Sequence, residues 1–288
     1  YRKMSVVSWG KVLMWTMERF NMFNIRPYDK EAVHLAIARA FSLKPRYSNY
    51  YGCQLGEGDD YIETDSSLVL RKKEGDFYRV YIMSVSQAEV VDILKLIPGV
   101  NVLNIPAKND IPEWKTLMQC AGFDMISMYE RYYYKKVKER KNAQTINYAT
   151  QEQTEVIYAL FRSHFSAYTD YLPAKDELAA LVEQGNVIVN YSEGRVCGAF
   201  IYEPEGRKCY LRAWYDEGEN GLKLLFDVYC IMHLKNISYA YFWVNSTNTN
   251  VKKIHELLGA VPDGLKDYTF IKNNYERENC KHIDGTPS

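Results

Sequence analysis

Hydrophobic and polar positions divide the chain into segments of two kinds. Short runs of alternating apolar and aromatic residues, such as 67–72 and 78–84, are typical of β-strands. Longer segments with apolar residues three and four positions apart, such as 30–41 and 221–234, are typical of amphipathic helices. Glycine and proline separate the segments, as Pro98-Gly99 does. The pattern therefore predicts an α/β fold.

The order of predicted elements is nearly the same in the two halves of the chain. In each half, paired strands are followed by a helix, a strand, a second helix and a final aromatic-rich strand. Gly122 and Gly259 each end the last helix of a half, and Glu130 and Asp267 each follow their glycine by eight residues. We therefore predict a tandem duplication, in which each half is a mixed central sheet with helices on both faces.

A basic and polar stretch marks the expected boundary between the halves. Residues 135–141 read KKVKERK and lead into the polar residues 142–144. The predicted domains are therefore 1–141, which we expect to be a degenerate copy, and 145–275, followed by a polar, disordered tail at 276–288.

Composition narrows the class of protein. The 288 residues are 47% hydrophobic and 25% charged, which is typical of a globular protein. The formal net charge is zero, whereas a protein that binds nucleic acid usually carries a basic excess. No apolar run is long enough to span a membrane, and the six cysteines show no metal-ligand spacing. We expect a cytoplasmic protein without nucleic acid or metal; its oligomeric state stays open.

The segment 241–260, YFWVNSTNTNVKKIHELLGA, reads as a strand, an Asn-rich turn and a helix. It resembles the last motif of the GNAT (N-acetyltransferase) superfamily. In that motif an Asn follows the strand, a helix Tyr follows the Asn by seven residues, and a Gly-Phe pair comes next. Asn248, His255 and Gly259 stand at the Asn, Tyr and Gly positions, and Ala260 replaces the Phe. The resemblance implies two tandem GNAT-like domains.

The resemblance also implies an acyl-CoA site in the second half. GNAT proteins bind the pyrophosphate with a glycine loop at a helix N-terminus, where free N–H groups favour an anion. Here the loop 216–221 reads DEGENG, and its three carboxylates depart from the family pattern. The gap between strands 208–214 and 239–244 is expected to admit the pantetheine arm. The residues expected to bind acyl-CoA are Trp214, Gly218, Asn220, Gly221, Leu222, Asn245 and Asn248.

The implied reaction transfers an acyl group, with acetyl expected, from acyl-CoA to an amine of a small molecule or peptide. His255 is the candidate catalytic residue, as the acid that protonates the thiolate with a pKa nearer neutrality than that of a tyrosine. Asp216 and Glu217 lie near where the base of the family acts, but both are equally well explained as solvated loop residues. The other histidines form no visible constellation: His34, His164, His233 and His282.

The first half lacks these signals. Its matching loop, residues 84–90, contains no glycine, and Ile111 and Met118 occupy the Asn and Tyr positions. Two alternatives to a GNAT enzyme therefore stay open. One is a Fem-type aminoacyltransferase, which also has two GNAT-like halves and lacks the glycine loop. The other is a catalytically inactive tandem GNAT module that binds a ligand or a protein.

Overall fold

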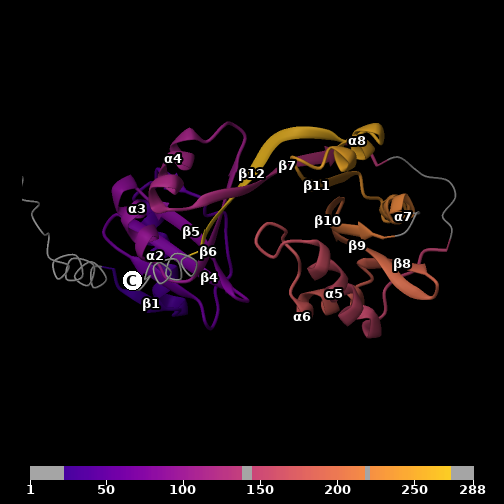
Figure 1. The fold of residues 1–288 in the computed structure, drawn as a ribbon, viewed down its shortest axis with the longest axis horizontal. Coiled ribbons are helices and arrows are strands. Elements are labelled where there is room, and N and C mark those ends of the chain that lie inside the picture. Colours follow the sequence, from indigo (N-terminus) through magenta and orange to yellow (C-terminus); the bar gives the residue numbers. More distant parts are fainter. Residues whose placement is uncertain (1–22, 138–144, 218–220, 274–288) are drawn as a thin grey trace, which may run out of the picture. The chain divides into compact units, whose positions relative to one another are not determined.

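The computed structural model describes residues 23–137, 145–217 and 221–273, which form two compact units (Figure 1). The first unit comprises the described parts of Tyr1–Pro106, Asp110–Ile126 and Thr269–Ser288, and the second those of Ala107–Asn109 and Ser127–Tyr268. The basic and polar stretch expected at the boundary lies outside the described residues from 138 to 144, as does the tail predicted at 276–288.

The first unit contains a sheet and three helices. Its strands lie in the order β1 (Ile25–Pro27), β3 (Asp60–Glu63), β4 (Ser67–Glu74), β5 (Phe77–Ser84) and β6 (Val100–Ala107), and β2 (Tyr47–Ser48) pairs with β5. The helices are α2 (Lys30–Ser42), α3 (Gln87–Leu96) and α4 (Pro112–Ala121). Asp29 caps α2 by accepting a hydrogen bond from the Ala32 N–H at 2.8 Å. Helix α2 buries Val33, Ala36 and Ala40, whereas Leu35 is 60% exposed.

The second unit contains the second sheet. Its strands lie in the order β12 (Val261–Asn273), β7 (Asp124–Tyr134), β11 (Tyr239–Asn245), β10 (Lys208–Asp216), β9 (Arg195–Glu205) and β8 (Val187–Ser192). Its helices are η1 (Gln151–Gln153), α5 (Thr154–His164), α6 (Lys175–Glu183), α7 (Gly221–Leu234) and α8 (Thr249–Leu257). Residues 145–149 form no regular strand; Tyr148 makes an isolated bridge with Ile188.

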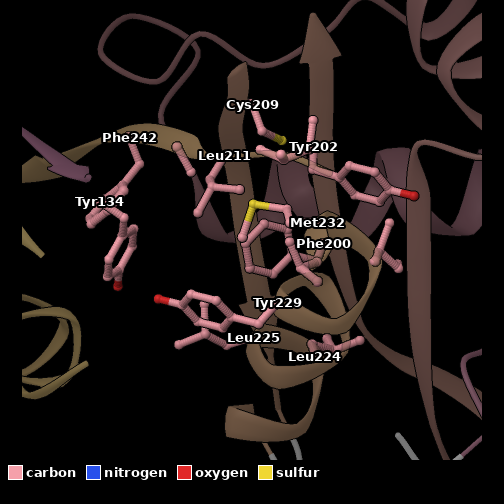
Figure 2. Close-up of a cluster of buried hydrophobic side chains, with 14 of the residues drawn as sticks. Tyr134, Phe200, Tyr202, Cys209, Leu211, Leu224, Leu225, Tyr229, Met232 and Phe242 are labelled. Carbon is pink, nitrogen blue, oxygen red and sulfur yellow. The ribbon is translucent and has the colours of Figure 1, made fainter. Parts of the chain in front are cut away.

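Helices cover both faces of the second sheet. Phe200 and Tyr202 of β9 pack with Leu224, Leu225 and other residues of α7, as Figure 2 shows. The alternate β9 residues Ala199 and Ile201 pack on the opposite face with residues of α5 and α6, including Ile157, Phe161, Leu178 and Leu181. Side chains of a strand alternate between the two faces of its sheet, so the apolar run in β9 serves both layers. The predicted α/β fold with helices on both faces is confirmed.

The last strand of each half of the sequence pairs with a strand from the other half. Strand β7 ends the first half, yet Ala240–Asn245 of β11 pair with Tyr129–Tyr134 of β7 in the second unit. Strand β12 ends the second half, yet it neighbours β6, and its residues from Thr269 onward belong to the first unit. The compact units therefore differ in their bounds from the predicted domains, although the tandem repeat of elements remains clear.

The two sheets share one irregularity. In the first unit, β5 and β6 pair in parallel only from Phe77 opposite Val100 to Arg79 opposite Val102. In the second unit, β10 and β11 pair in parallel only from Lys208 opposite Tyr239 to Tyr210 opposite Tyr241. Beyond these residues the two strands of each pair separate, and their facing edges no longer form ladder hydrogen bonds with each other. This opening is called the gap. Backbone groups there need other partners, because buried N–H and C=O groups are rarely left unpaired.

The first unit fills its gap with its own chain. Strand β2 pairs with Ser84 and Met83 at the end of β5. The next residue, Asn49, is 4% exposed; its Nδ2 donates to the carbonyls of Val80 and Asn104 at 3.0 Å each, and its Oδ1 accepts from the Ile82 N–H at 2.7 Å. Asn49 therefore bridges β5 and β6 where their ladder is interrupted.

Replacing Asn49 by alanine should destabilise the protein by about 2–4 kcal/mol, because three buried backbone groups lose their partner. Urea unfolding followed by fluorescence measures this. The matched control is Asn24→Ala, at an exposed position of the same unit, where a change within about 0.5 kcal/mol is expected. Equal effects of the two substitutions would show that Asn49 does not hold the gap closed.

Candidate functional site

A cavity of about 700 Å³ lies in the second unit where β10 and β11 separate. Residues 210–214 of β10 and 242–245 of β11 line it, together with the segment between α5 and α6 and the first turn of α8. The corresponding gap of the first unit holds Asn49, whereas this one is hollow. The cavity has two chemically different walls.

One wall is apolar and contains His255. The His255 ring lies 4.0 Å from the Phe242 ring, centroid to centroid, and 6.0 Å from that of Trp214, which meets it edge on. Trp214 in turn stacks on Phe200 at 6.0 Å, and Val251 of α8 completes this side. The Trp214 Nε1–H has no hydrogen-bond partner within the part of the chain that the structure describes.

His255 is buried, with 4% of its surface exposed. Burial lowers its pKa to about 4, so the imidazole is neutral at pH 7. The Tyr134 hydroxyl lies 2.7 Å from Nδ1 and 3.5 Å from the His255 carbonyl oxygen. Donation to Nδ1, at the shorter distance, leaves the ring proton on Nε2. The sequence-based expectation of a pKa nearer neutrality is therefore wrong.

The other wall is polar and is built around Asp170. One carboxylate oxygen accepts from the Tyr129 hydroxyl at 2.5 Å, and the other accepts from the Ser166 N–H at 2.9 Å and the Thr169 hydroxyl at 3.1 Å. Burial, and then the nearby Asp170 carboxylate, raise the pKa of Tyr129. Asp267, which is 7% exposed, lines the same cavity.

His164 lies at the edge of the polar wall, at the end of α5. Its ring stacks on Tyr215 with 3.8 Å between centroids. Its Nδ1 lies 2.9 Å from the Ser163 hydroxyl and 3.0 Å from the Leu160 carbonyl oxygen, and the same hydroxyl donates to that carbonyl at 2.9 Å. With the ring proton on Nδ1 all three contacts are hydrogen bonds, because the carbonyl can only accept. Nε2 is then the nitrogen that accepts a proton, and it lies 3.7 Å from the Glu217 carboxylate. This arrangement was missed from sequence, because 53 positions separate the two residues and folding alone brings them together.

A bulge in β10 fixes the polar wall. The register between β10 and β9 shifts between Leu211 and Ala213, which leaves Arg212 as the extra residue. The Arg212 guanidinium donates to the Tyr171 carbonyl at 2.9 Å and to the carboxylates of Glu177 and Glu203 at 2.5 and 3.0 Å. Arg212 therefore fastens the segment between α5 and α6, with its Asp170, to the central sheet.

The residues predicted from sequence have different positions. Trp214, Asn245, Asn248 and His255 line the cavity. The Asn248 Oδ1 accepts from the Val251 N–H at 3.2 Å and caps α8, and the Asn245 Oδ1 accepts from the Thr247 N–H and hydroxyl. Gly221 and Leu222 begin α7, and neither belongs to the cavity lining. Gly218 and Asn220 lie outside the described residues.

Asp216 and Glu217, the weak candidates for a base, do not line the cavity. The Asp216 carboxylate accepts a hydrogen bond from the Asn190 side chain at 3.0 Å and lies over Gly198 of β9. A Cβ at Gly198 would come within 2.6 Å of the Asp216 Cγ, so the glycine makes room for this carboxylate. Asp216 is thus directed onto the sheet, and Glu217 faces His164.

The first unit has a carboxylate at the corresponding helix N-terminus. Glu89, in the first turn of α3, accepts hydrogen bonds from the hydroxyls of Thr64, Ser66 and Ser67. Burial raises its pKa, but these three donors outweigh burial and the pKa is lowered. An internal anion therefore occupies the end of α3, where a helix favours negative charge.

Comparison of the structure with solved structures finds several of the same fold. A GCN5-related N-acetyltransferase from Sphaerobacter thermophilus matches with a TM-score of 0.53 at 11% identity, covering 87% of this chain and 95% of its own. A probable N-acyltransferase from Enterococcus faecalis V583 matches with a TM-score of 0.56 at 13% identity, over 87% and 72%. A tandem GNAT protein from the clavulanic acid biosynthesis pathway matches with a TM-score of 0.51 at 10% identity, over 87% and 98%.

These likenesses show that the chain has the tandem GNAT fold, as the motif at 241–260 predicted. No family model and no curated protein sequence matches it. Within the described residues, no helix is long and apolar enough to cross a membrane, and no group of His, Cys, Asp and Glu is arranged to hold a metal ion.

The low pKa of His255 predicts a loss of stability in acid. The unfolded chain binds a proton at this residue below pH 6.5, and the folded protein does so only near pH 4. Stability should therefore fall between pH 6.5 and 4, by up to about 3 kcal/mol from this group. Melting temperatures across this range should fall less steeply for His255→Gln than for the wild type. His34→Gln, at an exposed histidine, should retain the wild-type slope; the same slope in all three proteins would contradict the assignment.

Proposed function

We propose that the chain is an N-acyltransferase whose second unit transfers an acyl group, with acetyl expected, from acyl-CoA to an amine. The observation that carries the proposal is the hollow gap between β10 and β11. In proteins of this fold that gap admits the pantetheine arm, and here it opens into a cavity with an apolar and a polar wall. The structural likenesses to acetyltransferases support the fold on which the proposal rests.

The donor is expected at the N-terminal end of α7, which begins at Gly221. The first N–H groups of a helix lack partners within the helix and favour an anion such as a pyrophosphate. The three carboxylates of the loop 216–221 are an objection to this site, because they would repel a negatively charged pyrophosphate. The Asn190 amide holds the Asp216 carboxylate over Gly198, and Glu217 faces His164. The fold thus fixes the direction of two of the three carboxylates, although the neutral amide does not remove the charge of Asp216. This weakens the objection that the sequence raised.

His164 is the proposed base. An ammonium must lose a proton before its nitrogen can attack, and His164 offers Nε2 as the acceptor while Leu160 holds Nδ1. Glu217 lies close enough to stabilise the imidazolium that results. When bound, acyl-CoA supplies the acyl group as a thioester. The amide bond forms as the carbon–sulfur bond breaks, and the thiolate takes up one proton to give free CoA.

His255 is proposed to act on the leaving thiolate, as a hydrogen-bond donor and no longer as the acid expected from the sequence. The neutral ring cannot serve as an imidazolium at pH 7, but its Nε2–H can donate a hydrogen bond to a developing negative charge. The burial that lowers this pKa also favours a second candidate function, an inactive acyl-CoA-binding module, because strong acid catalysis by His255 is lost. A Fem-type enzyme differs from both, since its donor is not a CoA thioester.

Acetyl-CoA should bind the protein with a stoichiometry of one per chain. One site is expected because Asn49 and Glu89 occupy the equivalent positions of the first unit. Isothermal titration gives the stoichiometry, and acetyl-CoA at about 100 times its Kd should stabilise the protein by roughly 2.7 kcal/mol. Gly221→Trp should abolish binding because the indole covers the first N–H groups of α7.

The matched control is Leu234→Trp at the other end of α7, where the side chain is 76% exposed. This variant should bind acetyl-CoA as the wild type does. Normal binding by a folded Gly221→Trp protein would exclude the proposed donor site. An absence of binding by the wild type would exclude the acyltransferase and leave two alternatives: the Fem-type enzyme and an inactive module that binds another ligand or a protein.

His164→Gln should lower kcat by about 10²–10⁴-fold, the usual range for a proton-transfer group. His255→Ala should lower kcat by about 10²–10³-fold, the usual range for the loss of one hydrogen-bond donor to a developing negative charge. Neither substitution should change the Kd for acetyl-CoA. Amide formation followed by mass spectrometry, with a panel of primary amines, measures kcat. His34→Gln should leave turnover unchanged, because His34 is exposed on α2 in the first unit. Full turnover in either site variant removes the role proposed for that histidine.

A further inference from the structure

The polar wall of the cavity carries information about the acyl acceptor. It combines two carboxylates with four aromatic side chains: Asp170, Asp267, Tyr129, Tyr171, Tyr210 and Trp243. Burial raises the pKa of Tyr210; the Arg212 guanidinium lowers it, and the carboxylates of Glu203 and Asp170 raise it. The pKa of Tyr129 is raised as well. Tyr129 and Tyr210 are therefore neutral at pH 7.

The Asp170 carboxylate accepts three hydrogen bonds inside the polar wall. Its three donors are the Tyr129 hydroxyl, the Ser166 N–H and the Thr169 hydroxyl, all of which are uncharged. No lysine, arginine or histidine of the described ranges forms an ion pair with it. These donors fix the carboxylate in place without neutralising it, which is a suitable arrangement for attracting a cation.

The one Lys or Arg side chain in the described lining does not change this balance. Arg212 lies between Glu177 and Glu203, and it also donates to the Tyr171 carbonyl. Its charge is therefore offset by two carboxylates before any ligand arrives. An acceptor that carries its own carboxylate or phosphate would meet a guanidinium already bound to two carboxylates and would approach the Asp170 carboxylate against like charge.

Resting on the proposed function, we propose that the acceptor is an organic cation: a primary amine with an aromatic or apolar body and no carboxylate or phosphate group. The ammonium is attracted by Asp170 and Asp267 and by the faces of the surrounding rings, because the ring quadrupole is negative above its face. The body of the amine packs against Tyr129, Tyr210 and Trp243. Free amino acids, phosphorylated amines and acidic peptides are thus excluded as good acceptors.

Three probes of nearly one shape test this. 2-Phenylethylamine is a cation, phenylalanine is the same molecule with a carboxylate added, and 2-phenylethanol replaces the ammonium by a hydroxyl. Isothermal titration against the full chain should give a Kd for 2-phenylethylamine at least about ten-fold below those of the other two, since 1.4 kcal/mol of electrostatic preference corresponds to ten-fold. Asp170→Asn should reduce this preference at least about five-fold.

Two further variants keep the test decisive. Asp267→Asn should weaken the preference in the same direction, which covers the case in which Asp170→Asn disturbs the loop that its carboxylate holds. Glu193→Gln makes the same charge change in the exposed turn between β8 and β9 and should have no effect. Equal binding of the three probes, no binding of 2-phenylethylamine, or a preference that survives both aspartate substitutions would overturn the inference.

The test of the acceptor site can fail or succeed independently of the test of the proposed function. If acetyl-CoA fails to bind while 2-phenylethylamine binds through Asp170 and Asp267, the acyltransferase proposal is lost and the cation site stands. If acetyl-CoA binds with a stoichiometry of one and 2-phenylethylamine does not bind, the reverse holds.

Discussion

The chemistry open to this chain depends on one interruption in a backbone hydrogen-bond ladder. Strands β10 and β11 pair through three residues each and then separate, although β11 stays paired along its other edge with β7. A strand that is held on one edge and released on the other has backbone groups on the released edge that need other partners. The cavity and its two walls lie at this separation.

The first unit shows what happens when the same interruption is closed. Its β5–β6 ladder also ends after three pairs, but Asn49 bridges the two strands and Glu89 places a carboxylate at the N-terminus of α3. Three hydroxyl donors stabilise that carboxylate in its charged form. The two units therefore share the same interrupted strand pair. In the first unit side chains of the protein fill the gap, and in the second unit the gap is a cavity.

The two walls of the cavity differ in their electrostatic character. The apolar wall lowers the pKa of His255 by burial, so this side carries no charge at neutral pH. On the polar wall, uncharged donors hold the Asp170 carboxylate, and Arg212 is paired with Glu177 and Glu203. His164 lines the same cavity. The proposed base and the proposed cation-binding carboxylate therefore belong to one lining.

The sequence by itself determined the order of elements, the α/β class and the fold resemblance carried by Asn248, His255 and Gly259. These depend on local periodicity and on turn glycines, which short stretches of chain specify. The resemblance also located the gap between strands 208–214 and 239–244. The short strands β2 and β3 were missed.

Only the tertiary structure decided the rest, because the deciding contacts join residues far apart in the chain. Tyr134 reaches His255 across 121 positions, Tyr129 reaches Asp170 across 41, and His164 meets Glu217 at the edge of the cavity. The low pKa of His255 follows from burial, which a helical pattern does not reveal. The exchange of β7 and β12 between the units is equally invisible in local sequence, since a strand's pattern does not name its partner.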